Sequence, residues 1–202
     1  MARIAYFYCA RNTAEPERAS PEEILRCILL QLSSMTAKLP IKEPVHKAYN
    51  NKVGESEESG QQPEHLTLEE ATDILLEILQ ESPATIIIDA LDECDPGERH
   101  NLLSALDTII TESASLVRVF VSSRDDGDIV CQLTASPNVF IRASDNSADV
   151  KRYVHTEVDA AIKKKRIIRG NVSPEMKQMI INTLVEGAQG MFVSALTIIT
   201  PY

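Results

Sequence analysis

Several features that would place a chain in a common functional class are missing from this sequence. Its four cysteines form no C-x-x-C pair and have no histidine at ligand spacing, which argues against a zinc site and against a disulfide scaffold. No apolar run approaches the roughly 18 to 20 residues that a transmembrane helix requires, and the N-terminus is too short and strand-like for a signal peptide. We therefore expect a cytoplasmic protein with no membrane partner.

Positive charge is also scarce. The 202 residues include 20 basic and 30 acidic side chains, a formal net charge of -10, so binding nucleic acid would require a local basic patch. The basic cluster at residues 163–166 fits the end of a helix, where positive charge faces the helix dipole. No internal repeat is present that would indicate a solenoid. We expect no nucleic-acid partner.

The chain does contain a short apolar segment that ends in carboxylates. Residues 84–88, Ala-Thr-Ile-Ile-Ile, predict a buried strand, and Asp89, Asp92 and Glu93 follow it. Open α/β sheets place their ligands at the carboxyl ends of the strands, so Asp89 is a candidate ligand for Mg²⁺ beside a phosphate chain. Asp92 and Glu93 could then orient or deprotonate an attacking water. The alternative is that these acids only cap the next helix or face solvent.

A second apolar segment, residues 116–121, ends in polar residues that suit a phosphate ligand. Ser122, Ser123 and Arg124 follow it. Arg124 could sense or neutralise a γ-phosphate, because a guanidinium matches phosphate oxygens geometrically, and Ser123 would lie beside it. A surface arginine in a turn is the alternative. Cys94, next to the acids of the first segment, is not expected to be a nucleophile, because neighbouring carboxylates raise the pKa of a thiol.

The other apolar segments alternate between strand and helix patterns. Further strands are expected at residues 3–9 and 139–141. Helices are expected to begin after Ser20, after Thr67 and near residue 98, the first two being residues that cap helix N-termini. This alternation predicts an α/β fold with a mainly parallel sheet and right-handed crossovers.

We expect two domains. Residues 1–143 would form the α/β layer, and residues 144–202 carry helical patterns throughout. From about residue 40 to 65 the sequence is polar and acidic, with hardly any apolar side chain to anchor it. This composition favours a mobile insertion there.

Together these segments resemble the NACHT domain of the STAND NTPases, which are P-loop signal-transduction ATPases. Residues 85–94, with Asp-Ala-Leu-Asp-Glu, resemble the Walker B segment of that family, and residues 119–125, with Ser-Ser-Arg, resemble its sensor 1 strand. Residues 5–9 with the helix at 21–25 resemble the strand and helix that follow its nucleotide-binding loop, and residues 190–193 resemble a helix of its C-terminal subdomain. The likeness extends to the nephrocystin-like N-terminal modules of fungal proteins that carry ankyrin or WD repeats.

The resemblance implies ligands and roles. The intact family binds ATP and Mg²⁺ and uses the nucleotide state to control self-association, so protein partners or self-association are implied. Asp89 would coordinate Mg²⁺, Asp92 and Glu93 would assist hydrolysis, and Arg124 with Ser123 would contact the nucleotide. The implied fold is an incomplete P-loop NTPase-like parallel sheet flanked by helices, followed by a small all-helical subdomain.

One motif of that family is missing. The family cradles phosphates with G-x-x-x-x-G-K-[ST], whereas none of the seven glycines here is followed by Lys-Ser or Lys-Thr. In the family, this loop and the strand before it would precede Arg3, and that strand would lie between those near residues 120 and 140. We therefore expect a fragment of the module with either unpaired strand edges or direct pairing of those two strands. ATP binding and hydrolysis should be weak or absent.

Two other functions remain as alternatives. A non-catalytic interaction or regulatory module derived from a NACHT protein would retain the helical tail without the phosphate loop. A phospho-acceptor receiver domain would use Asp89 as acceptor with Ser122 or Ser123 as the partner hydroxyl. The chain lacks the acidic pair expected near the first strand of a receiver and the lysine expected on its last strand.

Overall fold

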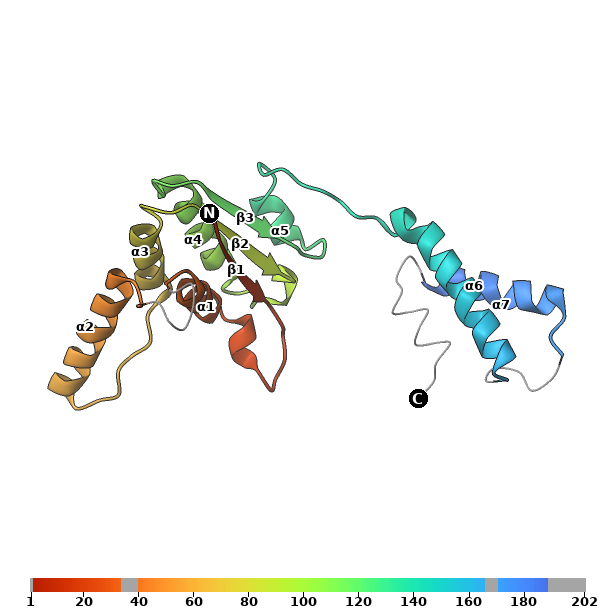
Figure 1. Cartoon of the computed structure of the whole chain (residues 1–202), viewed down its shortest axis with the longest axis horizontal. Helices are drawn as coiled ribbons and strands as arrows, with labels where there is room; N and C mark the ends of the chain where they lie inside the picture. Colours follow the sequence, from red (N-terminus) through yellow and green to blue (C-terminus); the bar gives the residue numbers. More distant parts are fainter. Residues whose placement is uncertain (1, 34–39, 166–170, 189–202) are drawn as a thin grey trace. The chain divides into compact units, whose positions relative to one another are not determined.

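The computed structural model describes residues 2–33, 40–165 and 171–188, and the chain divides into two units (Figure 1). The first unit comprises residues 1–136 and the second residues 137–202.

The first unit is built on a parallel sheet in the order β1-β2-β3 (Figure 1). Its strands are β1 (Arg3–Tyr8), β2 (Ala84–Asp89) and β3 (Val117–Val121). In the register, Tyr6 lies beside Ile87 and Ile87 beside Phe120. The expected α/β fold with a parallel sheet is confirmed.

The first unit also contains the helices α1 (Pro21–Ser33), α2 (Glu43–Ser59), α3 (Leu68–Ile78), α4 (Arg99–Glu112) and α5 (Gly127–Gln132), with 3₁₀ turns at Pro16–Ala19 and Leu91–Glu93. Helices α1, α3 and α4 cover one face of the sheet, and α2 packs against α3. The apolar stripes of α1, α3 and α4 join the same core as Ala5, Ile86 and Ile88, which alternate along their strands toward that face. The residues between them, such as Ile4 and Tyr6, are exposed on the opposite face.

Local signals in the sequence fix the starts of two of these helices. Ser20 accepts a hydrogen bond from the Glu23 N–H at 3.4 Å, just before α1. At α3, the Glu70 N–H donates to Thr67 Oγ1 at 3.2 Å, and the Thr67 N–H donates back to Glu70 Oε2 at 2.8 Å. This reciprocal capping box satisfies main-chain donors that the helix itself leaves unpaired.

Most of the segment at about residues 40–65, where we expected a mobile insertion, is a helix, α2 (Glu43–Ser59). Val45 and Ala48, one helical turn apart, are partly buried against the main core. Gly60 ends the helix in the left-handed conformation, with φ of 67°. Two small apolar contacts thus anchor a helix whose composition alone favours disorder.

The strand expected at residues 139–141 is also absent. These residues have no regular structure, and Val139, Phe140 and Ile141 are exposed. An isolated three-residue run gains too few hydrogen bonds to persist without a partner strand. Within the described residues β3 pairs only with β2, so of the two sheet arrangements that we considered, the structure has the unpaired edge.

All the regular structure described in the second unit is helical. It contains a 3₁₀ turn at Ala143–Asn146, α6 (Ser147–Lys163) and α7 (Pro174–Ala188). Val150, Val154 and Val158 of α6 form a separate core with Ile181 and Leu184 of α7. Residues 190–193, which resemble a helix of the family's C-terminal subdomain, lie outside the described residues. No helix in the described ranges is both long and apolar enough to cross a bilayer.

Candidate functional site

The acid at the end of β2 contacts the residue that follows β3. Asp89 Oδ1 accepts a hydrogen bond from the Ser122 hydroxyl, and Ser122 Oγ accepts one from the Ala90 N–H at 3.0 Å. Ala90 has a left-handed φ of 56°, which costs a non-glycine residue about 1 to 2 kcal/mol. Ser122 therefore fixes a strained turn at the carboxyl edge of the sheet and leaves Asp89 exposed.

Ser123, which we predicted to contact the nucleotide, makes a local contact in this structure. Its hydroxyl donates to the carbonyl oxygen of Arg124 at 2.7 Å, so it satisfies the local backbone. The serine that contacts a site carboxylate is Ser122.

Arg124, which follows β3, lies beside Asp92 and Glu93, which follow β2. The sequence predicted that these neighbouring strand ends would bring them to the same sheet edge. The Arg124 N–H donates to Asp92 Oδ1 at 3.1 Å, and Arg124 Nε lies 3.5 Å from Asp92 Oδ2. Arg124 Nη2 lies 3.9 Å from Glu93 Oε1. The arginine side chain is 82% exposed and that of Asp92 is 8% exposed, so the acid is held while the guanidinium can move. An ion pair this exposed contributes little stability.

Arg11 is a site residue that the sequence did not reveal. It lies in the loop after β1, where its N–H donates to Glu93 Oε2 at 3.2 Å. Its Nη2 donates to the carbonyl oxygens of Asp92 at 2.8 Å and Cys94 at 3.0 Å. A signal was available, because the loop after a parallel strand lies at the same sheet edge as the ends of its neighbours.

A third arginine, Arg99, is buried beneath the turn at residues 91–93 and binds its main chain. It is only 1% exposed although it is charged. Its Nη1 donates to the Asp92 carbonyl at 3.1 Å and makes a long contact of 3.4 Å with the Leu91 carbonyl. Its Nε and Nη2 bind Asp128 at 2.9 and 2.7 Å, and Nη2 binds Asp126 at 3.1 Å. Arg99 therefore joins the turn after β2 to the start of α5.

These contacts shift the proton affinities of the groups involved. Burial opposes the charge of Arg99, but the hydrogen bonds and charges of Asp128 and Asp126 outweigh it and raise the pKa of the guanidinium. The hydrogen bond from Arg99 is the main cause that lowers the pKa of Asp128.

Neither buried thiol near the site is a ready nucleophile. Burial is the main cause that raises the pKa of Cys94 to about 11, with Arg99 opposing it. Burial also raises the pKa of Cys9 to about 12, helped by Cys94, Asp89 and Asp92. Cys94 is therefore inert as expected, although burial contributes more than the carboxylates that we had named.

The residues at the strand ends could supply only part of the coordination shell of a magnesium ion. Within the described residues no three His, Cys, Asp or Glu side chains converge on one point. Asp89 is an exposed carboxylate at the sheet edge, and Mg²⁺ is commonly held by one or two carboxylates together with water and phosphate oxygens. The donor set thus suits a magnesium ion that arrives with a phosphate chain, with Asp89 as its protein ligand.

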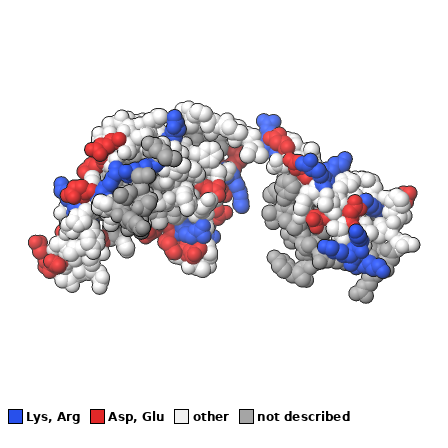
Figure 2. Space-filling view, in the orientation of Figure 1, with Lys and Arg blue, Asp and Glu red and all other residues white. Residues whose placement is uncertain are grey.

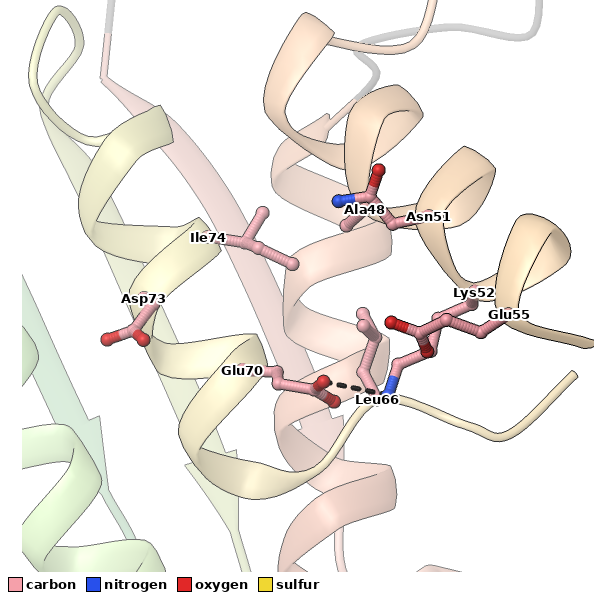
Figure 3. A pocket seen from close by; sticks show the side chains of 8 residues that line it. All are labelled: Ala48, Asn51, Lys52, Glu55, Leu66, Glu70, Asp73 and Ile74. Atoms are coloured by element: carbon pink, nitrogen blue, oxygen red, sulfur yellow. Dashed lines mark ion pairs between the residues drawn. The ribbon is translucent and has the colours of Figure 1, made fainter.

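A pocket lies between α2 and α3, and none of the strand-end residues described above lines it (Figure 3). Lys52 Nζ lies 2.7 Å from Glu70 Oε1 across it. The hydrogen bond between them is the main cause that raises the pKa of Lys52 and lowers that of Glu70. The ion pair joins α2 to the capping box of α3, so these pocket residues have a structural role.

Figure 2 shows acidic and basic side chains interspersed on the visible face of each unit.

One family model, described as nephrocystin 3, N-terminal, matches residues 1–124. This range contains all three strands and ends at Arg124. No curated protein and no solved structure shows significant similarity to the chain.

Proposed function

The chain belongs to the nephrocystin 3 N-terminal family, and from this membership we propose that it is part of a NACHT-type signalling NTPase module. In an intact module, ATP and Mg²⁺ would bind at the carboxyl edge of the sheet, and the nucleotide state would control self-association. The observation that supports this proposal best is that two groups lie at the same sheet edge: Asp89 with Ser122, and Arg124 with Asp92 and Glu93.

Each side chain suits one task in phosphate chemistry. Asp89, exposed and oriented by Ser122, would hold the magnesium ion, which neutralises phosphate charge when bound. Asp92 and Glu93 carry carboxylate oxygens that could accept protons from an attacking water. Arg124 is exposed and could turn from the acids toward a γ-phosphate.

These 202 residues are proposed to be inactive as an ATPase on their own. They contain no Gly-Lys-Ser or Gly-Lys-Thr loop, and each charge-assisted phosphate contact that such a loop makes contributes about 1.5 to 3 kcal/mol. Asp92 and Glu93 are also already engaged by Arg124 and Arg11. The acids therefore form the magnesium and water side of a site whose phosphate cradle the chain does not supply.

Titration of the isotopically labelled chain with Mg-ATP tests this proposal. We expect no heat of binding at micromolar nucleotide and no phosphate release above background. At millimolar nucleotide we expect small NMR shift changes confined to residues 89–93 and 122–124, which Asp89→Asn abolishes. Asp107→Asn, which removes an acid of α4 outside the site, is the matched control and should leave those changes intact.

Two results would count against the proposal. Micromolar binding would show that the phosphate loop is dispensable. Shift changes elsewhere, or none at the strand ends, would remove the assignment of these acids to a nucleotide site.

The second candidate is a non-catalytic interaction module derived from a NACHT protein. The internal pairing of Asp92 and Glu93 with Arg124 and Arg11 favours it, because acids held in this way can stabilise the fold without any ligand. Co-purification with a complete NACHT relative that is unaffected by Asp89→Asn would support this candidate, and its loss in that variant would favour the nucleotide site.

A further inference from the structure

Ser122, the first residue after β3, uses all of its polar groups to bind the turn that follows β2. Its N–H donates to the Ile88 carbonyl at 2.9 Å, and its carbonyl accepts from the Leu91 N–H at 2.9 Å. Its hydroxyl oxygen accepts from the Ala90 N–H at 3.0 Å, and the hydroxyl itself donates to Asp89 Oδ1. One residue therefore contacts four successive residues of the chain.

The direction of the hydroxyl bond follows from the groups on either side of it. The Ala90 N–H can only donate, so it occupies a lone pair of Ser122 Oγ, and an ionised carboxylate can only accept. The hydroxyl proton therefore points at Asp89 Oδ1. Among the described residues, no hydrogen bond or ion pair reaches the other carboxylate oxygen, Asp89 Oδ2, and the side chain is exposed.

The two neighbouring acids differ from Asp89 in this respect. Asp92 Oδ1 accepts from the Arg124 N–H at 3.1 Å, and Asp92 Oδ2 lies 3.5 Å from Arg124 Nε. Glu93 Oε2 accepts from the Arg11 N–H at 3.2 Å, and Glu93 Oε1 lies 3.9 Å from Arg124 Nη2. Both oxygens of these two acids thus face groups of arginine residues, whereas Asp89 has one oxygen held by a hydroxyl and one oxygen open to a ligand.

We propose that Ser122 is a positioning residue for magnesium, which holds the Asp89 carboxylate through Oδ1 so that Oδ2 is the atom available to the ion. This inference rests on the proposed function, in which Asp89 binds magnesium. Carboxylates that bind metals are in turn hydrogen-bonded, and losing such an outer partner typically weakens metal binding by about 10- to 100-fold. A carboxylate that is already fixed loses less side-chain freedom when the ion binds.

A role for Ser122 in the turn alone is the alternative. Ala90 has a left-handed φ of 56°, and the bond from its N–H to Ser122 Oγ supports that strained conformation. Glycine adopts the same conformation without strain. In an Ala90→Gly background the turn no longer depends on this support, while the bond from Ser122 to Asp89 remains, so the two roles can be separated.

Mn²⁺, which prefers the same oxygen ligands as Mg²⁺, is the probe that tests the proposal. Titrated into the isotopically labelled full chain, it broadens the amide NMR signals of nearby residues, so its affinity at residue 90 is read separately from its binding to other acids. Signals around Asp107, an exposed acid of α4 outside the site, are the internal reference. We expect Ser122→Ala to weaken Mn²⁺ binding at residue 90 about tenfold and to leave binding at Asp107 unchanged. Ser122→Thr, which keeps the hydroxyl, should bind as the native chain does.

The same comparison is repeated in the Ala90→Gly background. Adding Ser122→Ala there should weaken Mn²⁺ binding by the same factor, because Asp89 Oδ1 again loses its donor. Ser115→Ala is the matched control, since Ser115 precedes the opposite end of β3 and its hydroxyl donates to the Gln80 carbonyl at 3.2 Å. It should leave Mn²⁺ binding unchanged. Circular dichroism of each variant establishes that it is folded.

The outcomes distinguish this inference from the proposed function. Native affinity in Ser122→Ala would overturn the positioning role, as would a loss that disappears in the Ala90→Gly background or a Ser122→Thr variant that binds no better than Ser122→Ala. In each of these cases the magnesium site at Asp89 would stand. Asp89→Asn should abolish the broadening at residue 90. If it does not, or if the native chain shows no broadening there, the magnesium site of the proposed function fails, and this inference fails with it.

Discussion

Three arginines organise the strand-end acids, each with a different chemistry. Arg11 binds main-chain carbonyls of the acidic turn and the side chain of Glu93. Arg99 is buried and joins that turn to α5. Arg124 is exposed and pairs with Asp92 and Glu93 from the surface. The buried one is expected to matter most for stability, because its hydrogen bonds cannot be replaced by water.

Arg99→Met should therefore lower the free energy of unfolding of the first unit by about 2 to 4 kcal/mol. The Leu91 carbonyl would lose its buried contact and the Asp92 carbonyl would keep only Arg11 as a donor, while Asp126 and Asp128 are exposed enough to be solvated. Urea denaturation measures the change. Lys47→Met, which removes an exposed charge from α2, is the control and should change stability by less than about 0.5 kcal/mol. Equal effects of the two substitutions would contradict a special role for Arg99.

The Arg99–Asp128 contact should also be visible in the pH dependence of stability. Because the folded-state pKa of Asp128 is lowered, its contribution is fully present above the unfolded value of about 3.9 and is lost as the pH falls through the folded value. Between about pH 5 and pH 2, the stability of the native chain should therefore fall more steeply than that of Asp128→Asn.

Urea midpoints across that pH range provide the measurement. Asp107→Asn, at an exposed position of α4 with no ion pair among the described residues, should keep the native slope. If the stability of Asp128→Asn falls with pH as steeply as that of the native chain, the Arg99–Asp128 contact does not contribute to stability in solution.

At the scale of helices and strands, polar contacts at helix caps and at the sheet edge connect elements that are far apart in the sequence. The capping box of α3 also receives the Lys52–Glu70 ion pair, so the start of α3 and the middle of α2 are connected. Gln31 of α1 in turn closes the β1 edge. Elements distant in sequence are thus joined by single polar side chains.

Thr67→Ala should destabilise the first unit by about 1 kcal/mol, the usual cost of losing an N-cap. Thr108→Ala is the matched control, since the Thr108 hydroxyl donates to a carbonyl within the same helix, α4, and alanine has the higher helix propensity. It should be neutral or slightly stabilising. Chemical denaturation of both variants measures the difference, and a neutral Thr67→Ala would mean that the cap is not formed in solution.

At the scale of the whole molecule, the described residues form two separate cores. The core of the first unit contains described residues up to Leu133, and the core of the second begins at Val150. No buried residue belongs to both. Each unit can therefore lose core packing without removing a contact from the core of the other.

Ile181→Ala should reduce the stability of the second unit by about 2 to 5 kcal/mol and leave the first unit unchanged. Leu75→Ala, at a fully buried position of α3, should have the reverse effect. Hydrogen exchange read by mass spectrometry separates the two units in one experiment. Faster exchange of both units in either variant would show that they unfold together.

Much of the first unit could be predicted because its signals are local. The apolar run of β2, the acids after it and the Thr67–Glu70 box each lie within a few residues, and they gave the strand, the carboxyl-edge cluster and a helix start correctly. The predicted likeness to nephrocystin-like N-terminal modules, which rested on the same motifs, is confirmed over residues 1–124. The roles of the acids in catalysis and magnesium binding stay predictions.

The sequence by itself determined the periodic elements, their caps and the family, because these depend on neighbouring residues. The tertiary structure alone decided which distant groups meet. Arg11 reaches Glu93 across 82 positions, and α2 forms because Val45 and Ala48 find a core to pack against. Residues 139–141 stay irregular for the opposite reason, since a strand needs a partner and its own sequence cannot supply one.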